Sequence, residues 1–303
     1  MEYTAYFNGS WVPNSEIRID PFDRGFRVGD VVFETERTFN GKVFRLREHI
    51  ERLYRSLTYT RIDSELSPEE MLDISEEVVR RNEHLRSDVG DFTVHQFVTR
   101  GKNGPRFRAR DAGPPTVSVR VSPVSFGRYA EAYSSGVHGV ISRVRSYSSE
   151  SLDPKIKTYS RMHFNLAEME VADIDPEGWP ILTDLDGNLT EGTSYNVFLV
   201  TDGVIRTPTD RAVLQGVSRG MVFDLARQLD IPVVEEDLQP YDLYTADEAF
   251  FTTTSPCVVP VTKADNRQIA DGKPGPITLQ LLAAWSETVG LDIVDQALMY
   301  AKD

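Results

Sequence analysis

Apolar and aromatic residues dominate short stretches at the start of the chain, a pattern typical of β-strands. Two turn signals divide this stretch, because Asn8-Gly9 and Asn40-Gly41 both favour the positive φ angles of tight hairpin turns. We therefore expect one hairpin with strands at residues 3–7 and 11–12. A second hairpin should join strands at residues 31–39 and 42–44.

Helical spacing follows the two hairpins. Apolar residues recur every three or four positions between Leu46 and Leu57, which predicts an amphipathic helix over residues 45–57. The sequence Ser67-Pro68-Glu69-Glu70 is a capping box with proline at the first helical position, so a second helix should run to about residue 82. Strands are expected at residues 92–99 and 116–121, separated by the loop GKNGPRFRARDAGPP.

The pattern restarts after a loop-like stretch near residue 125, and strands and helices again mix. We expect helices at residues 162–172, 218–229 (with Ser218 as N-cap), 276–289 and from about 293. Strands are expected at residues 136–144, 179–183, 195–201, 231–235, 248–253 and 258–262. The chain is therefore predicted to be α+β, with a small domain (1–122), a linker (123–128) and a larger domain (129–303).

Composition and charge narrow the possible functions. A chain of 303 residues suggests two domains, and 40% hydrophobic residues are enough for a sizeable core. Cys257 is the single cysteine, which excludes an internal disulfide or a multi-cysteine zinc site and favours a reducing, cytoplasmic compartment. The net charge of −14 disfavours nucleic acid and anionic membranes as partners, and no apolar run is long enough to span a bilayer. Phosphate-loop and paired-histidine metal motifs are missing, so we expect no metal.

Five segments, in order along the chain, together resemble the class IV, or fold-type IV, pyridoxal-phosphate aminotransferases. They are DRGFRVGDVVFETERTFNGKVFRLREHIERLYRS, DPKIKTYSRMHFNLAEMEV, DGNLTEGTSYNVFLVTDGVIRTP, VLQGVSRGMVFDLA and ADEAFFTTTSPCVVPV. The family includes branched-chain aminotransferases, D-amino-acid transaminases, (R)-selective amine transaminases and aminodeoxychorismate lyase. The resemblance implies a two-domain fold like that of D-amino-acid aminotransferase, with the cofactor between domains. It also implies a homodimer whose pocket is completed by a loop of the neighbouring subunit.

The resemblance assigns two residues to the reactive part of the cofactor. Lys157 matches the lysine that binds pyridoxal phosphate covalently and later moves a proton, whereas Lys155 would point to the opposite face of a strand. Glu191 matches the glutamate that keeps the pyridine nitrogen protonated. The sequence DLDG before Glu191 also resembles the start of a calcium loop, but it lacks the remaining ligands at the required spacing.

The resemblance assigns four further residues to the cofactor phosphate. Arg52 matches the phosphate-binding arginine of the family. Val217 and Ser218 lie where a helix is expected to begin, so their N–H groups and the serine hydroxyl can hold phosphate oxygens. Thr254 matches a threonine with the same role, although the residues that flank it offer the same hydroxyl chemistry.

The substrate-facing residues mix the signatures of several subfamilies. Phe33, Thr35 and Arg37 alternate on one face of a strand that lines the pocket in this family. Arg106 and Arg108 lie on the following loop, where D-amino-acid transaminases carry an Arg-x-His pair for the substrate carboxylate. The same two arginines can also be read as a solvated basic patch.

One position departs from the branched-chain pattern. Those enzymes carry a tyrosine five residues after the lysine, where this chain has Met162 and instead places Tyr159 two residues after Lys157. We expect a ping-pong transaminase that moves an amino group between an amino acid or primary amine and a 2-oxo acid. A branched-chain or (R)-amine transaminase is favoured, with D-amino-acid transaminase or aminodeoxychorismate lyase as alternatives.

Overall fold

The computed structural model describes residues 2–301, and these residues form two compact units. The first unit comprises the chain up to Val124 together with Ile156–Ser160. The second comprises Ser125–Lys155 and the chain from Arg161 onward. Each unit combines helices with strands, so the predicted α+β class is confirmed.

The first unit is built on an antiparallel sheet in the strand order β2-β1-β6-β5-β3-β4. Its strands are β1 (Thr4–Phe7), β2 (Ser10–Pro13), β3 (Val31–Phe39), β4 (Lys42–Val43), β5 (Phe92–Thr99) and β6 (Val117–Pro123). Both predicted hairpins are present, and all four residues of their Asn-Gly turns have positive φ.

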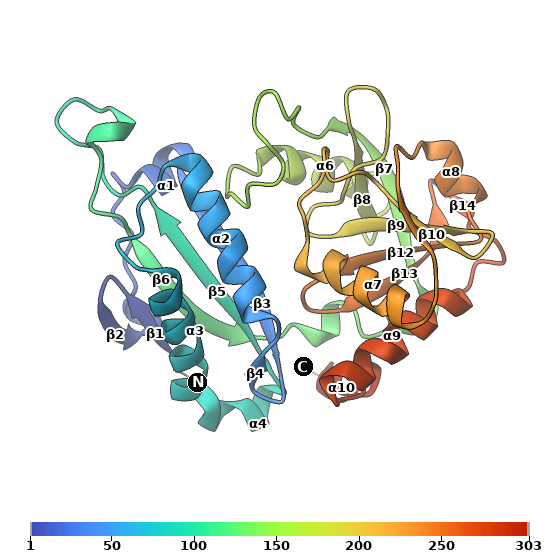
Figure 1. Cartoon of the computed structure of the whole chain (residues 1–303), viewed down its shortest axis with the longest axis horizontal. Helices are drawn as coiled ribbons and strands as arrows, with labels where there is room; N and C mark the ends of the chain where they lie inside the picture. The colour runs from blue at the N-terminus through green and yellow to red at the C-terminus, as the bar shows by residue number, and fades with distance from the viewer. Residues whose placement is uncertain (1, 302–303) are drawn as a thin grey trace. The chain divides into compact units, whose positions relative to one another are not determined.

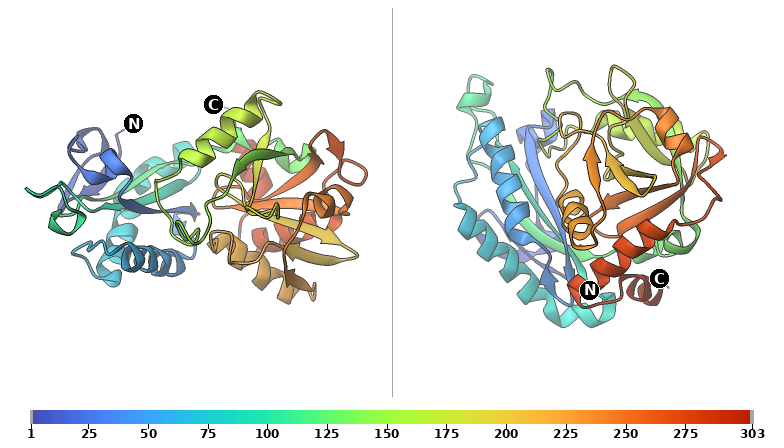
Figure 2. Two further views of the ribbon diagram at one scale, coloured as in Figure 1. Left: turned by 90° about the horizontal axis from the view of Figure 1, so that it is seen from above. Right: turned by 45° about the vertical axis from the view of Figure 1, so that its right-hand side comes forward.

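Two long helices, α2 (Leu46–Thr60) and α3 (Pro68–Asn82), pack on one face of this sheet (Figure 1). Figure 2 shows them lying alongside one another from two further directions. The predicted capping box is formed, because the Ser67 hydroxyl accepts from the Glu70 N–H and the Glu70 carboxylate accepts from the Ser67 N–H. Short helices complete the unit: η1 (Asn14–Glu16), α1 (Arg24–Val28), η2 (Glu83–Leu85), α4 (Arg86–Val89) and η3 (Ala109–Asp111).

The second unit contains a mixed sheet in the order β11-β10-β9-β12-β13-β7-β8, with β14 beside β13. Strands β7 and β8, β7 and β13, and β10 and β11 pair in parallel, whereas the other neighbours are antiparallel. The strands are β7 (Val137–Arg145), β8 (Trp179–Thr183), β9 (Asn196–Thr201), β10 (Val204–Thr207), β11 (Val233–Glu235), β12 (Glu248–Thr253), β13 (Cys257–Ala264) and β14 (Arg267–Gln268).

Helices cover this second sheet. Helix α6 (Met162–Ala172) packs on β7 and β8, while α7 (Val217–Gln228) and α9 (Pro276–Val289) pack on β12. The remaining helices are η4 (Phe126–Arg128), α5 (Ala132–Ser135), α8 (Pro240–Thr245) and α10 (Ile293–Tyr300). The expectation that Ser218 is an N-cap is wrong, because Gly216 is the last extended residue and Ser218 lies within the first turn of α7.

The segment Ile156–Ser160 belongs to the first unit, although the sequence-based boundaries assign it to the second domain. Strand β4 pairs with only the end of one edge of β3. The backbone of Ile156–Ser160 lies along the rest of that edge. The Phe33 N–H donates to the Lys157 carbonyl at 3.0 Å, and Val32 forms a bridge with Thr158. This placement gives backbone groups at that edge of β3 hydrogen-bond partners that they would otherwise lack.

Within residues 2–301, no single helix is both long and apolar enough to cross a bilayer. Helices α9 and α10 reach the required length only when they are counted together, across a bend of 85°.

Candidate active site

Lys157 lies beside an aromatic pair in the first unit. Its Nζ is 4.8 Å from the centroid of the Phe33 ring, and the Tyr159 ring lies 4.2 Å from the same ring. The backbone N–H of Lys157 also donates to the Ser56 hydroxyl at 3.3 Å. Lys155, in contrast, lies in the second unit and forms an ion pair with Asp153. The two lysines therefore have different surroundings.

Thr35 follows Phe33 on the same face of β3 and contacts β5. Its hydroxyl lies 3.3 Å from Nδ1 of His95, the residue opposite it in the register, and Nε2 of His95 lies 3.2 Å from the Ser122 hydroxyl. Burial, together with the positive charges of Arg120 and Lys157, lowers the pKa of His95 to about 4. His95 is therefore a neutral imidazole at neutral pH, fixed between two hydroxyl groups.

The three arginines predicted to meet substrate have unlike environments. Arg37 is 1% exposed, and its guanidinium carbon lies 4.0 Å from the centroid of the Phe39 ring. Its Nε also donates to the Thr38 carbonyl at 3.2 Å. Arg106 and Arg108, in contrast, are exposed on the loop between β5 and β6. Arg37 is thus fixed within the sheet, while the two loop arginines are accessible.

The opposite face of β3 carries a buried ion pair. The Glu34 carboxylate accepts from Nε of Arg52 at 2.6 Å and from a terminal nitrogen at 2.7 Å, and Nδ1 of His49 donates to it at 2.8 Å. Burial alone would raise the pKa of Glu34, but the Arg52 charge and these hydrogen bonds hold that pKa well below its usual range. Glu34 therefore fixes the guanidinium of Arg52 on α2.

Glu36, two residues further along β3, is paired less tightly, with its Oε1 3.8 Å from Nδ1 of His49. Neither of its carboxylate oxygens has a hydrogen bond within residues 2–301, and the amide oxygen of buried Gln96 has none either. Burial and the neighbouring Glu34 charge raise the pKa of Glu36 well above its usual value. Burial therefore favours the neutral, protonated form of Glu36. Glu34, Glu36 and His49 lie close enough to hold a cation, but the charge of Arg52 opposes one there.

Glu34 and His49 are candidate functional residues that we did not predict from the sequence. A signal was present, because two acids, Glu34 and Glu36, share one face of a strand expected to line the pocket. A buried carboxylate requires a charged or hydrogen-bonding partner. An arginine and a histidine on the following amphipathic helix could have been proposed as those partners.

The second unit positions Glu191 beside the loop that leads into α7. The Glu191 carboxylate is buried and accepts from the Leu214 N–H at 3.2 Å. Asn196 pairs with Glu191 through the backbone, and its side-chain amide donates to the Leu214 carbonyl at 2.9 Å. These contacts fix a carboxylate next to the start of a helix.

The start of α7 is suited to an anion. Gly216 is its N-cap and has no side chain, so no side-chain cap occupies the first N–H groups, those of Val217 and Ser218. A Cβ on Gly216 would approach Oδ1 of Asn196 to 2.3 Å, which explains the glycine. Asn196 is also opposite Thr252 in the β9–β12 register, and Thr254 follows β12 half-buried. The second unit therefore gathers backbone donors, hydroxyls and a carboxylate.

The backbone donors and hydroxyls suit a phosphate, and the Glu191 carboxylate suits a protonated ring nitrogen. A fold of two mixed α+β units that carries such groups is that of the pyridoxal-phosphate aminotransferases of fold type IV. More particularly, residues 31–264 match the family described as amino-transferase class IV. The chain belongs to this family, so it is an aminotransferase and pyridoxal phosphate is its cofactor.

Curated relatives extend over nearly the whole chain. A putative branched-chain-amino-acid aminotransferase of Methanocaldococcus jannaschii is 36% identical over 281 residues, which cover 91% of this chain and 93% of that protein. The D-alanine aminotransferase of Bacillus licheniformis is 32% identical and covers 93% and 96% of the two chains. This chain is thus similar to enzymes of both subfamilies.

Solved structures of branched-chain enzymes share the fold. The branched-chain amino acid aminotransferase of Thermobaculum terrenum in its PLP-form has a TM-score of 0.83 at 25% identity, covering 99% of this chain and 96% of the other. The branched-chain aminotransferase of Thermoproteus uzoniensis with norvaline has a TM-score of 0.84 at 26% identity, covering 99% and 97%.

Proposed function

We propose that this enzyme moves an amino group between a donor with an apolar substituent and a 2-oxo acid. The favoured donors are branched-chain amino acids and (R)-amines, used in a ping-pong reaction. The observation that carries this proposal is the aromatic pair of Phe33 and Tyr159 beside the Lys157 amine. Aromatic rings contact aliphatic or aryl groups favourably, so this pair suits a donor with an apolar substituent.

We assign the cofactor to six side chains or backbone groups. Lys157 and Arg52 of the first unit bind its reactive carbon and its phosphate. Val217, Ser218 and Thr254 of the second unit add phosphate donors, and Glu191 pairs with the ring nitrogen. When bound, pyridoxal phosphate supplies an electron-withdrawing ring that stabilises negative charge at the substrate α-carbon.

The chain's own groups have separate tasks in this proposal. The Lys157 amine accepts the α-proton of the donor and later returns a proton to the acceptor carbon. Two bonds to the Glu34 carboxylate keep the Arg52 guanidinium in one orientation, and its permanent charge suits a phosphate dianion. Glu191 is acceptor-only when ionised, so it favours a protonated partner.

We assign the acceptor carboxylate to the exposed Arg106 and Arg108, with Arg37 as the alternative. A 2-oxo acid needs a cationic group, and a guanidinium fork binds a carboxylate through two bonds. Arg37 already stacks on Phe39, and this contact would have to be kept or broken on binding. The exposure of the loop arginines supports our choice.

A D-amino acid is the second candidate donor. The similarity to D-alanine aminotransferases of 32% identity supports this alternative. Phe33, however, has no hydroxyl with which to hold a donor carboxylate. An aminodeoxychorismate lyase would use the same cofactor residues and release pyruvate, so assaying pyruvate release from aminodeoxychorismate distinguishes it.

We further propose that two copies of the chain form a homodimer. Support comes from α6, where Met162, Leu166 and Met169 follow helical spacing and are 66%, 54% and 69% exposed. An apolar stripe of this kind is typical of a surface covered by another protein, and a second copy is the partner we propose. Cys257 is buried and is the chain's single cysteine, which supports a reducing compartment such as the cytoplasm.

The proposed donor is tested by a half-reaction screen without acceptor. Holoenzyme is mixed with L-leucine, D-alanine or (R)-1-phenylethylamine, and the visible absorbance of the bound cofactor is followed. We expect L-leucine or (R)-1-phenylethylamine to react fastest. If D-alanine reacts fastest, the apolar-donor assignment is wrong and the D-amino-acid alternative replaces it.

A further inference from the structure

The loop that carries Arg106 and Arg108 has a defined internal structure. Its two arms meet closely, because a Cβ on Gly101 would lie 1.8 Å from the Pro114 carbonyl oxygen and one on Gly104 would lie 1.9 Å from that of Asp111. The Gly113 N–H also donates to the Lys102 carbonyl at 3.1 Å. Since the arms are packed together, a displacement at the base of the loop is transmitted to the arginines.

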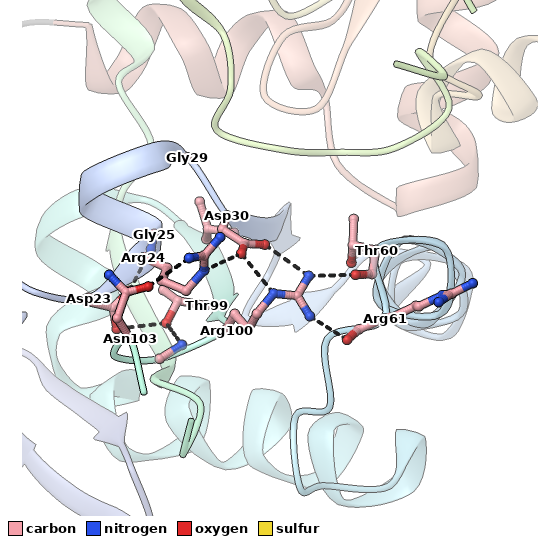
Figure 3. A network of polar contacts seen from close by, with 12 residues as sticks. Asp23, Arg24, Gly25, Gly29, Asp30, Thr60, Arg61, Thr99, Arg100 and Asn103 are labelled. Atoms are coloured by element: carbon pink, nitrogen blue, oxygen red, sulfur yellow. Dashed lines mark hydrogen bonds and ion pairs between the residues drawn. The ribbon is translucent and has the colours of Figure 1, made fainter. Parts of the chain in front are cut away.

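Arg24 of α1 binds Asn103 at the base of this loop. One terminal nitrogen of Arg24 donates to Oδ1 of Asn103 at 2.7 Å, and its Nε donates to the Asp30 carboxylate at 2.8 Å (Figure 3). The side chains of Arg24 and Asp30 are 16% and 15% exposed. Arg24 therefore connects the start of the arginine loop with the residue that precedes β3.

Asp30 also binds a second arginine, Arg100, whose other hydrogen bonds reach the end of α2. Nε of Arg100 donates to the same Asp30 oxygen at 2.8 Å. The terminal nitrogens of Arg100 donate to the carbonyls of Thr60 and Arg61 at the end of α2, both at 2.6 Å (Figure 3). Burial alone would raise the pKa of Asp30, but the two arginines lower it, so the carboxylate stays charged.

We propose that Arg24 and Asn103 are positioning residues for the acceptor site, orienting the loop through which Arg106 and Arg108 bind the 2-oxo acid carboxylate. This inference rests on the proposed function of the two loop arginines. Neither Arg24 nor Asn103 touches the acceptor in this scheme. Their effect is on the binding of the acceptor, because a small error in the orientation of a guanidinium weakens a bidentate bond steeply.

Asn103 gives the sharpest variant. Its side-chain oxygen accepts from Arg24, so Asn103→Ala removes the link while leaving the Arg24–Asp30 pair in place. Asn103→Asp keeps an acceptor oxygen at the same position and should rescue the link. Arg100→Ala is the matched control, because it removes an equally buried partner of Asp30 that leads to α2 instead of the loop.

The experiment measures kcat and KM of holoenzyme for 2-oxoglutarate and pyruvate, with the most active donor from the half-reaction screen. We expect Asn103→Ala to raise the acceptor KM about tenfold with little change in kcat, which is the effect of losing one charge-assisted hydrogen bond. Asn103→Asp should stay within about twofold of the parent, since the charge-assisted acceptor is retained. Arg100→Ala should lower the melting temperature and leave KM unchanged.

Three results would overturn the inference. If Asn103→Ala leaves KM unchanged while Arg106→Ala or Arg108→Ala raises it, the loop arginines bind the acceptor without help from Arg24 and Asn103. Equal increases in Asn103→Ala and Arg100→Ala would show a general loss of stability instead of positioning. If Arg106→Ala and Arg108→Ala have no effect on KM, the assignment of the acceptor site is wrong, and the inference that rests on it is wrong as well.

Discussion

At the scale of single residues, the environment of His95 determines its chemistry. Its two ring nitrogens lie next to the hydroxyls of Thr35 and Ser122, each of which can donate or accept. A neutral imidazole fits this arrangement, because one nitrogen donates while the other accepts. A protonated ring would add a charge to a buried position beside Arg120.

This environment makes the stability of the fold depend on pH. The unfolded chain binds a proton on His95 below its usual pKa of 6.5, whereas the folded chain binds it only near pH 4. Stability is therefore fully present above the first value and is lost as the pH falls between the two. The free energy of unfolding should fall by about 2 kcal/mol between about pH 7.5 and about pH 5.

Urea unfolding of the parent and of His95→Gln at these two pH values tests the loss. The parent's free energy of unfolding should differ between the two pH values, and we expect this difference to be smaller by about 2 kcal/mol in His95→Gln. The exposed His84→Gln is the matched control and should leave the difference in place. A His95→Gln protein with the parent's pH dependence would contradict the assignment.

At the scale of elements, the two faces of strand β3 have different surroundings. Phe33 and Thr35 lie on the face near Lys157 and His95, whereas Glu34 and Glu36 face α2. The two glutamates are both fully buried, yet Glu34 is bound tightly by Arg52, whereas Glu36 has a longer contact with His49, at 3.8 Å, and a raised pKa. Their substitutions should therefore have unequal effects.

We expect Glu34→Gln to lower the free energy of unfolding by about 3 to 5 kcal/mol, because the buried Arg52 charge loses its counter-ion. It should also weaken cofactor retention. Glu36→Gln replaces a neutral acid with a neutral amide of the same shape and should cost less than about 1 kcal/mol. Chemical denaturation of both variants at neutral pH provides the measurement, and similar losses would show that Glu36 is ionised too.

Strong local signals made most elements predictable. The Asn8-Gly9 and Asn40-Gly41 turns and the Ser67 capping box each fix a local geometry by themselves. Elements without such signals were missed, including the five-residue α1 and the four-residue β10, because so few residues show no periodicity. Helix α2 continues to Thr60, three residues past the predicted end.

The site was predictable only where the family resemblance supplied it. Lys157, Arg52 and Glu191 come from motif matches, and their roles stay predictions. The sequence did not indicate that the Lys157 segment packs on the edge of β3, because this contact joins residues more than a hundred positions apart. Long-range contacts of this kind depend on tertiary packing, which local patterns do not encode.

At the scale of the whole molecule, the proposed homodimer is the property most open to test. Helix α6 packs on β7 and β8 and carries the exposed apolar stripe of Met162, Leu166 and Met169 on its outer side. The centre of its exposed stripe is Leu166, and covering that stripe would remove its apolar surface from water. A charge at that position should therefore prevent association.

Light scattering of purified Leu166→Glu at micromolar concentration should report a monomer, while the parent chain scatters as a dimer. Leu298→Glu is the matched control, because Leu298 is similarly exposed (48% against 54%) but lies on α10. It should remain dimeric. A monomeric parent chain, or a dimeric Leu166→Glu variant, would rule out α6 as the dimer surface.

The central claim of this account is that Lys157 is the lysine that binds the cofactor and moves the proton. Borohydride reduction of the holoenzyme followed by peptide mass mapping tests it most directly, with Lys157→Ala and Lys155→Ala measured in parallel. We predict a phosphopyridoxyl mass on Lys157, complete loss of turnover in folded Lys157→Ala, and near-normal turnover in Lys155→Ala. A label on Lys155 or on any other lysine, or substantial turnover in Lys157→Ala, would contradict the account.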